Sequence, residues 1–401
     1  MNKATRYFFM SGYHPTVIDS QVFSWLEVTK GLFENNHIVN LGSKTEQKLS
    51  SDAKRDIERR IDGRYIEFRR LRYPIIRDLQ LLWFVLRMYR NKDKQSTFLL
   101  QSRTMVFSFL MPVLRMLPSF RYIHEARGTA ITEYMYARKN GNGKPGRYLL
   151  IRLREYMSLK LANKIICVSR CQKDFMMSEY GISKDKILVV PCAADSRSFY
   201  FSESLMHGMR EELDISNRVV FLYSGALDEL WHQSEVIFKT IKKINSALPE
   251  SYFIMLTPNK NIAISLFTKH EIPDSDFMVD YADNKEIVRF LNAADYGFLI
   301  REDSPINHHA SPTKFSEYVL CGLKVIMSDN IGDYSQFVKN HDCGVVGEFS
   351  YDGLNIDCHS LQQVSQADKQ RISNIGKKYL SKDAYVSSIG SFIRELVNDD
   401  C

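Results

Sequence analysis

The chain lacks the features that would place it in a membrane or in an oxidising compartment. Its 401 residues contain no run of 18 uncharged apolar residues, so no transmembrane helix is predicted. No basic, apolar and small-residue signal segment opens the chain. The seven cysteines are odd in number and scattered, and Cys167-x3-Cys171 has no second ligand pair at zinc spacing. Buried free thiols in a reducing cytoplasm are therefore expected.

Positive charge is scarce in the second half and abundant in the first. Residues 1–200 hold 35 lysines and arginines against 18 acidic residues, whereas residues 201–401 hold 19 against 29. Halves of opposite sign predict two domains with different partners, and the length has room for two domains near 200 residues each.

The basic excess is concentrated in residues 54–103. Lys54–Arg70 is expected to be helical, because its apolar residues Ile57, Ile61, Tyr65 and Phe68 recur at helical spacing.

Two apolar stretches with embedded arginines follow, Leu79–Tyr89 with Arg87 and Met105–Leu117 with Arg115, the second interrupted at Pro112. A helix lying on an anionic membrane surface and a core helix flanked by solvated arginines both fit this pattern.

The most informative stretch is Tyr296–Asp329, which reads as one βαβ unit. Ser311-Pro312 is expected to open its helix, with Ser as N-cap and Pro at the first helical position, and Gly322 to close it. Two apolar runs of strand length flank the helix, Tyr296–Arg301 and Leu323–Ser328.

The start of this helix is suited to an anion, because it follows the carboxyl end of a strand. The N–H groups of Thr313, Lys314 and Phe315 would face the ligand, Lys314 and Arg301 would add charge, and Glu317 lies one turn further along. A diphosphate with a ribose fits these groups. The alternative is an ordinary capped helix with a surface Lys and Glu.

The motif SPTKFSEYVLCGLKVI, residues 311–326, resembles the nucleotide-sugar site of family-4 retaining glycosyltransferases, which have the GT-B fold. Lys314 and Glu317 fall on family positions, and the resemblance implies that Glu317 holds the donor ribose. Where the family commonly has a sugar-binding Glu, eight positions earlier, this chain has His309. Two alternatives follow: His309 or a neighbour takes over the sugar contact, or this chain handles its sugar differently from the family.

A second landmark supports the resemblance. Leu159–Phe199 carries Val168-Ser169, Tyr180-Gly181-Ile182, Lys186, Pro191, Asp195 and Phe199 at family positions, with Cys192-Ala193-Ala194 replacing the usual Asn-Gly-Val. In the family this element ends the first domain. After Gly225, where the family has a phosphate-binding Arg and Lys, this chain has neither, so Arg301 and Lys314, helped by His232, must supply that charge.

The resemblance implies an α/β protein of the GT-B class: two Rossmann-like doubly wound domains facing across a cleft, with a C-terminal helix crossing back to the first domain. The acceptor-binding domain is expected at residues 1–200 plus about 384–401, and the nucleotide-sugar domain at 201–383. At the reacting centre we expect the polar residues His124, Glu125, Arg127 and His309. At the donor we expect Arg301, Ser311, Thr313, Lys314, Phe315, Glu317, Val279, Asp280, Gly225, His232 and Gly12.

The function so implied is a retaining glycosyltransferase, cytoplasmic and peripheral on the inner membrane. It would move a sugar from a UDP- or GDP-sugar to a glycan acceptor, lipid-linked, in bacterial O-antigen or capsule biosynthesis. No cofactor or metal is expected, since the resemblance implies a fold class that usually works without a bound metal. Two other classes remain open, a nucleotide-sugar epimerase of the same fold and, more remotely, a nucleic-acid-binding protein, although no motif of that class is visible.

Overall fold

The computed structural model describes residues 4–11, 19–42, 49–71, 73–139, 141, 146–227, 233–283 and 286–398. The chain divides into two compact units, one formed by Met1–Pro191 with Tyr385–Cys401 and the other by Cys192–Ala384. The division after Pro191 lies close to the change in charge balance near residue 200.

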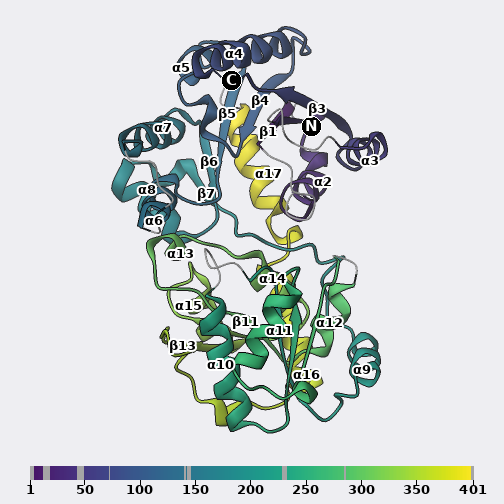
Figure 1. Cartoon of the computed structure of the whole chain (residues 1–401). Coiled ribbons are helices and arrows are strands. Elements are labelled where there is room, and N and C mark those ends of the chain that lie inside the picture. Colours follow the sequence, from purple (N-terminus) through teal and green to yellow (C-terminus); the bar gives the residue numbers. More distant parts are fainter. Residues whose placement is uncertain are drawn as a thin grey trace. The chain divides into compact units, whose positions relative to one another are not determined.

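The first unit is built on a seven-stranded parallel sheet in the order β3-β2-β1-β4-β5-β6-β7 (Figure 1). The chain runs outward from β1 in one direction and resumes at β4 in the other, so the order of strands reverses between β1 and β4. The strands are β1 Ala4–Met10, β2 Asn35–Gly42, β3 Gly63–Arg69, β4 Thr97–Ser102, β5 Phe120–Ala126, β6 Lys164–Cys167 and β7 Ile187–Val189. The helices are α2 Ser24–Val28, α3 Ser51–Ile61, α4 Pro74–Arg90, α5 Met111–Leu114, α6 Ala130–Lys139, α7 Tyr148–Leu161 and α8 Arg170–Tyr180.

The prediction of one helix over Lys54–Arg70 is wrong. The helix α3 ends at Ile61, Asp62 takes the left-handed conformation with φ of 54°, and the chain continues as β3. A Cβ on Gly63 would lie 1.4 Å from the Asn36 carbonyl oxygen, so only glycine lets β3 start against β2. The Asp-Gly pair was the turn signal that the apolar spacing obscured.

The predicted helix Met105–Leu117 is also shorter than expected. A 3₁₀ turn covers Met105–Phe107, and α5 spans only Met111–Leu114. Pro112 lies in the first turn of α5, where it begins a helix instead of interrupting one.

The last helix, α17 Asp383–Asn398, packs on the first unit, as predicted. The Arg121 side chain of β5 donates from Nε to the Leu396 carbonyl at 3.1 Å. Lys164 of β6 forms an ion pair with Glu395 at 2.9 Å and lies 4.6 Å from the centre of the Phe392 ring. The chain therefore crosses twice between the units, once after Pro191 and once in α17.

The second unit is a six-stranded parallel sheet in the order β10-β9-β8-β11-β12-β13, and its buried hydrophobic residues form two large clusters. Its order reverses between β8 and β11. The strands are β8 Val219–Ser224, β9 Ser251–Leu256, β10 Phe277–Asp280, β11 Tyr296–Leu299, β12 Lys324–Ser328 and β13 Gly344–Gly347. The helices are α9 Glu203–Glu212, α10 Ser234–Ala247, α11 Lys260–Lys269, α12 Ile287–Ala293, α13 Pro305–His308, α14 Thr313–Leu320, α15 Tyr334–His341 and α16 Gln366–Tyr379.

The amino edge of this sheet is closed by a buried ion triad. Asp295, which precedes β11, accepts from Arg210 of α9 at 2.6 Å and lies 3.6 Å from Lys369 of α16. Burial lowers the pKa of Lys369 to about 8, against the opposing effect of Asp295. These charges hold α9 and α16 against the amino edge of the sheet.

Candidate active site

The carboxyl edge of the second sheet gathers most of the predicted donor residues. Gly225 directly follows β8, and Arg301 lies two residues beyond β11, on the two sides of the strand-order reversal. Open α/β sheets bind ligands at this place, because the loops on the two sides diverge and leave room between them. The predicted helix after β11 is α14, which begins at Thr313.

Lys314 lies directly against the backbone of Gly225. A Cβ built on Gly225 would come within 1.9 Å of the Lys314 Nζ, and Gly225 has a φ of 143°, which favours glycine. The Lys314 Nζ also lies 5.2 Å from the centre of the Tyr223 ring. The ammonium group is thus brought to the end of the central strand, where the phosphate-binding cations of the family were missing from the sequence after Gly225.

The start of α14 differs from the prediction in two respects. Its N-cap is Pro312, with ψ of 124°, and not Ser311. The Ser311 hydroxyl instead accepts from the Cys192 N–H at 2.8 Å and lies 2.8 Å from the Tyr334 hydroxyl. The Phe315 N–H, expected to face an anion, donates to the Pro312 carbonyl at 3.1 Å, and the Phe315 ring stacks on Tyr334 at 4.0 Å. The Ser311 hydroxyl, the Phe315 N–H and the Phe315 ring are therefore all engaged with groups of the protein.

The end of α14 is as predicted. Gly322 has a φ of 83°, its N–H donates to Val319 and the Leu323 N–H donates to Tyr318, which is a Schellman motif. One turn earlier, Tyr318 accepts from the Ser224 N–H at 3.1 Å, so that helix α14 is fixed against the end of β8.

Glu317 is half-buried on the same helix as Lys314. Burial raises the pKa of Glu317, and the positive charges of Lys314 and Lys382 oppose this shift without cancelling it. Within the described part of the chain, no group donates a hydrogen bond to this carboxylate. A partly desolvated carboxylate with unused acceptor capacity is suited to bind vicinal hydroxyls.

Arg301 and His309 come from the loop between β11 and α14, which contains the unpredicted short helix α13. The Arg301 backbone is clamped by Ser328, whose hydroxyl accepts from the Arg301 N–H at 2.9 Å and donates to its carbonyl at 2.7 Å. His309 is half-buried. Burial is the larger cause, and the charge of the neighbouring His308 the smaller cause, that lowers the pKa of His309 to about 4. At neutral pH its imidazole is therefore uncharged, unlike the carboxylate of the family.

The remaining donor residues are placed less directly. Val279 and Asp280 end β10 on the same edge; the Asp280 carbonyl accepts from the Thr257 N–H at 2.8 Å, and its carboxylate pairs with Lys260 at 2.6 Å. Thr313 is the first residue of α14. Gly12 and His232 lie outside the described residues.

In the first unit, Glu125 is the centre of an ion-pair network at the end of β5. Its carboxylate accepts from the Arg103 Nε at 2.6 Å, from the Arg127 guanidinium at 3.3 Å and from the Gln101 amide. Burial would raise the pKa of Glu125, but the charges and hydrogen bonds of Arg103 and Arg127, with Gln101, lower it to about 2. Glu125 and Arg127 are thus brought together, with their charges largely used on each other.

His124 is separated from that network by the strand alternation, since neighbouring residues of β5 point to opposite faces. Its Nδ1 lies 3.0 Å from the Tyr122 hydroxyl, on the face of the main hydrophobic cluster. Burial lowers the pKa of His124 to about 4, so the imidazole is neutral at pH 7. The three polar residues of β5 and its following loop therefore form two separate arrangements.

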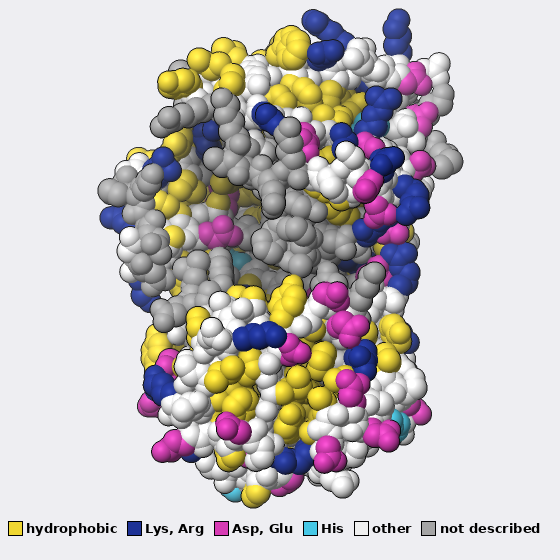
Figure 2. Space-filling view, turned by 45° about the vertical axis from the view of Figure 1, so that its right-hand side comes forward, with side chains coloured by type: hydrophobic (Ala, Val, Ile, Leu, Met, Phe, Trp, Pro, Cys, Tyr) yellow, Lys and Arg dark blue, Asp and Glu magenta, His cyan; other side chains and the backbone are white. Residues whose placement is uncertain are grey.

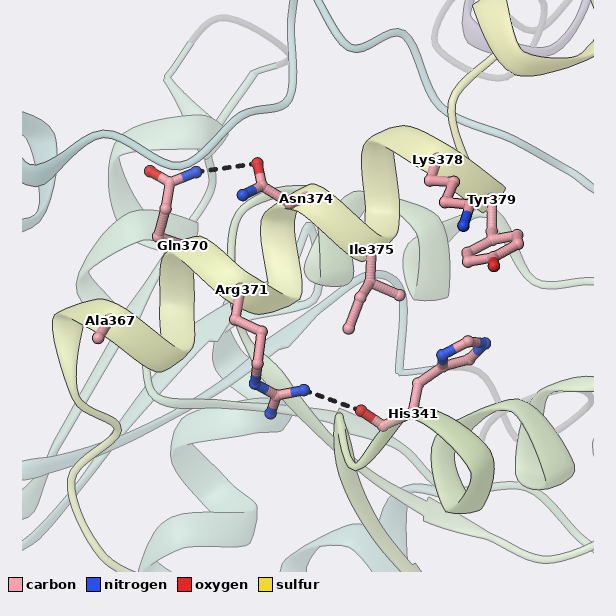
Figure 3. Close-up of a pocket in the computed structure, with 8 residues that line it drawn as sticks. All are labelled: His341, Ala367, Gln370, Arg371, Asn374, Ile375, Lys378 and Tyr379. Carbon is pink, nitrogen blue, oxygen red and sulfur yellow. Dashed lines mark hydrogen bonds between the residues drawn. The ribbon is translucent and has the colours of Figure 1, made fainter.

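A groove elsewhere on the second unit is not this site. It has a volume of about 620 Å³ and is lined by His341 of α15 and by residues of α16 (Figure 3). Its Arg371 donates to the His341 and Asp342 carbonyls at the end of α15 and bonds Asp368. That guanidinium caps a helix, and none of the predicted donor residues lines the groove.

Comparison with known proteins assigns one part of the chain to a family. Residues 25–197 match the model of Glycosyltransferase Family 4. Residues 25–197 are a glycosyltransferase family 4 domain. The chain is therefore a glycosyltransferase, and the resemblance inferred from its motifs is confirmed. No curated protein matches the chain in sequence.

The solved structures that the chain resembles have the GT-B fold. HepE of Anabaena, solved with UDP and glucose, has a TM-score of 0.67 at 12% identity, covering 98% of this chain and 100% of HepE. A glycosyltransferase of Rickettsia africae has a TM-score of 0.67 at 15% identity, covering 100% of both chains. WaaG, a glycosyltransferase involved in lipopolysaccharide biosynthesis, has a TM-score of 0.60 at 12% identity, covering 98% of this chain and 100% of WaaG. The likeness at these identities establishes the fold, and the predicted GT-B class is confirmed.

Sequence reasoning missed two residues of the site, Lys382 and Asn307. Lys382 is 1% exposed, its N–H donates to the Ala194 carbonyl, and its charge acts on both Glu317 and Asp195. Asn307 bonds the Arg301 guanidinium. Neither belongs to a motif, and only the fold brings each of them to the edge of the sheet.

Proposed function

We propose that this glycosyltransferase takes a sugar from a nucleoside diphosphate sugar, UDP- or GDP-linked, and transfers it to a hydroxyl with retention of anomeric configuration. The observation that carries the proposal is the contact of the Lys314 Nζ with Gly225, together with Glu317 one turn later on the same helix. Lys314 and Arg301 would neutralise the leaving diphosphate, and Glu317 would accept from the ribose hydroxyls. HepE, which shares the fold, was solved with UDP-glucose.

The sugar itself would be met by other groups. His309, uncharged at neutral pH, offers a hydrogen bond to a sugar hydroxyl, and His124, Glu125 and Arg127 would border the reacting centre from the first unit. We further propose that the reaction proceeds without a bound metal, because fixed cations of the chain supply the charge that the leaving group requires. Chelation with EDTA should then leave the transfer rate unchanged.

The acceptor we propose is lipid-linked, in bacterial surface polysaccharide assembly, and it is reached by docking at an anionic membrane. Ile76, Leu79 and Trp83 are 52%, 61% and 60% exposed and recur at helical spacing along α4. The Arg87 guanidinium lies 5.4 Å from the centre of the Trp83 ring. Figure 2 shows hydrophobic side chains beside Lys and Arg at the end of the first unit where α4 lies. No helix among the described residues is long and apolar enough to cross a membrane.

Exposed apolar side chains beside long cations suit an anionic lipid surface, where the rings and alkyl groups enter the interface and the cations meet headgroups. Flotation with phosphatidylglycerol vesicles tests this: the wild type should float, and Leu79→Ser with Trp83→Ser should not. Ile262→Ser is the matched control, because Ile262 is 46% exposed on α11 of the second unit. Flotation unaffected by the α4 changes would contradict the docking proposal.

The donor proposal is tested by thermal unfolding against nucleoside diphosphates and nucleotide sugars. A ligand that binds only the folded state raises Tm, and one base should do so in the wild type. Lys314→Ala and Glu317→Ala should lose the shift, whereas Lys269→Ala, an exposed lysine of α11, should keep it. No shift with any nucleotide would contradict the donor site. An epimerase would share it, so the product must also be examined: an epimerised donor without transfer would support that alternative.

A further inference from the structure

Asn307 is a buried hub of the loop that carries Arg301. It lies in α13 and is 3% exposed, and both the oxygen and the nitrogen of its amide form hydrogen bonds. The Oδ1 accepts from the Arg301 guanidinium at 3.3 Å, and the Nδ2 donates to the Glu302 carbonyl at 2.9 Å and to the Ser304 hydroxyl at 3.1 Å.

These partners fix the orientation of the amide. A rotated amide would place its oxygen against the Glu302 carbonyl and its N–H groups against the guanidinium of Arg301, which itself only donates. The oxygen therefore faces Arg301 and the nitrogen faces the loop.

The backbone of Asn307 fixes the same hub to a second loop. Its carbonyl accepts from the Gly332 N–H at 3.0 Å, beyond the end of β12, and from the Ala310 N–H at 3.1 Å within its own loop. Arg301 is tied to β12 separately, by Ser328. The loops after β11 and β12 are thus joined at Asn307, and the guanidinium is oriented from a rigid support.

The chemical type of the acceptor matters as much as its position. In the first unit, Arg103 is bonded by a carboxylate, Glu125, whose charge opposes that of the guanidinium at 2.6 Å. An amide oxygen orients a guanidinium through the same kind of hydrogen bond but carries no net charge. The hydrogen bond with Asn307 therefore orients the Arg301 guanidinium without placing a negative charge against it.

We propose that Asn307 is a positioning residue that orients the Arg301 guanidinium toward the donor diphosphate through a neutral contact. The inference rests on the proposed function, in which Arg301 meets the diphosphate. It predicts that replacing the amide by an isosteric carboxylate weakens recognition of the diphosphate specifically and leaves recognition of the nucleoside intact.

The test is calorimetric titration of full-length Asn307→Asp and wild type with UDP and uridine, or with GDP and guanosine if the wild type binds that base. For the variant we expect the affinity for the diphosphate to fall at least tenfold and that for the nucleoside to change less than twofold. An equal fall for both ligands, or no fall for the diphosphate, would overturn the inference.

Asn292 provides a matched control. It is 0% exposed and its amide likewise accepts one hydrogen bond and donates two: Oδ1 accepts from the Ser202 N–H at 2.7 Å, and Nδ2 donates to the Tyr200 and Val288 carbonyls at 3.0 and 2.8 Å. None of these partners is an arginine. Asn292→Asp should leave the ratio of diphosphate to nucleoside affinity unchanged, and an equal change of that ratio in both variants would contradict a specific role for Asn307.

A double-mutant cycle covers the case in which Asn307→Asp does not fold. The substitution Asn307→Ser should lower diphosphate affinity when Arg301 is present. It should have no such effect in the Arg301→Gln variant, because Asn307 acts through Arg301. Additive effects would contradict the inference. A wild-type protein that binds no diphosphate would instead contradict the proposed function, so the two failures are distinguishable.

Discussion

Two glutamates at the carboxyl edges of the two sheets have opposite electrostatic environments. Glu125 follows the pattern of a scaffold, because Arg103, Arg127 and Gln101 bond its carboxylate and lower its pKa to about 2. Glu317 follows the pattern of a binding group, because burial raises its pKa while no described residue donates a hydrogen bond to it. Folding alone supplies the partners of Glu125, and in the proposed function the donor ribose supplies those of Glu317.

The contrast suggests a role in stability for Glu125 and a role in recognition for Glu317, although the two residues are of the same type. Both residues are glutamates that lie near cations, Glu125 at the end of β5 and Glu317 one turn into α14. The difference is whether the acceptor atoms are already used, which is a property of the folded chain.

The largest predicted effect is on stability at Glu125. Glu125→Ala leaves Arg103 and Arg127 without their common anion inside the protein, and breaking such a buried pair costs roughly 3–5 kcal/mol of unfolding free energy. Equilibrium urea unfolding measures it. Glu317→Ala is the comparison and should change stability by less than about 1 kcal/mol. Equal losses in the two variants would remove the distinction.

The next effect concerns the contact between Lys314 and Gly225. In Gly225→Ala the new methyl group occupies the position of the Nζ, at a φ of 143°, so Lys314 must move. We expect donor affinity to fall roughly tenfold or more, equivalent to the loss of one charge-assisted hydrogen bond. Gly208→Ala on α9, where nothing lies within 4 Å of the new methyl, should bind normally. Normal donor binding by Gly225→Ala would contradict the proposed role of Lys314.

The two glutamates also predict different pH dependences. The pKa of Glu125, about 2 in the folded protein against an ordinary 4.5, means that its contribution to stability is complete above about pH 4.5 and is lost as pH falls toward 2. The raised pKa of Glu317 has the opposite sign for folding: the protonated form is favoured, and that contribution is lost as pH rises through the folded value.

Under the proposed function the Glu317 carboxylate accepts from the ribose hydroxyls, so donor affinity should decline on acidification while the first unit is still stable. Calorimetric titration at successively lower pH should show this decline, up to about tenfold per pH unit below the pKa. In Glu317→Gln the decline attributable to this group should disappear. A decline that persists unchanged in that variant would assign the titration to another group.

The smallest effect concerns Ser311, whose hydroxyl accepts from the Cys192 N–H and lies 2.8 Å from the Tyr334 hydroxyl. Ser311→Ala leaves the Cys192 N–H and the Tyr334 hydroxyl without this partner and should cost about 1 kcal/mol of unfolding free energy. Donor affinity should remain within about twofold of the wild type, as calorimetry would measure. A large loss of donor affinity with unchanged stability would indicate that Ser311 contacts the donor.

The sequence predicted the βαβ unit around α14 well because its signals are local. Gly322 fits a left-handed cap, and the apolar runs on either side have the length of buried strands. The helix start was misassigned because Ser followed by Pro also fits an N-cap, and only the fold shows that the hydroxyl is engaged by Cys192 and Tyr334.

Other parts depended on contacts that are distant in sequence. The spacing of Ile57, Ile61, Tyr65 and Phe68 fits one helix, whereas Gly63 is needed for close approach to β2. Grouping His124 with Glu125 ignored the alternation of a strand, which sends them to opposite faces. Asn307 and Lys382 have no pattern at all, because their partners are set by loops that meet only in the folded domain.

The most direct test of the account is whether Glu317 recognises the ribose hydroxyls. Binding of the nucleoside diphosphate and of its 2′,3′-dideoxy analogue should be measured by calorimetry for the wild type and for Glu317→Ala. The wild type should lose roughly tenfold or more in affinity for the dideoxy analogue, and Glu317→Ala should bind both ligands with the same weakened affinity. If Glu317→Ala discriminates the two ligands as well as the wild type does, then Glu317 does not hold the ribose and the central claim is wrong.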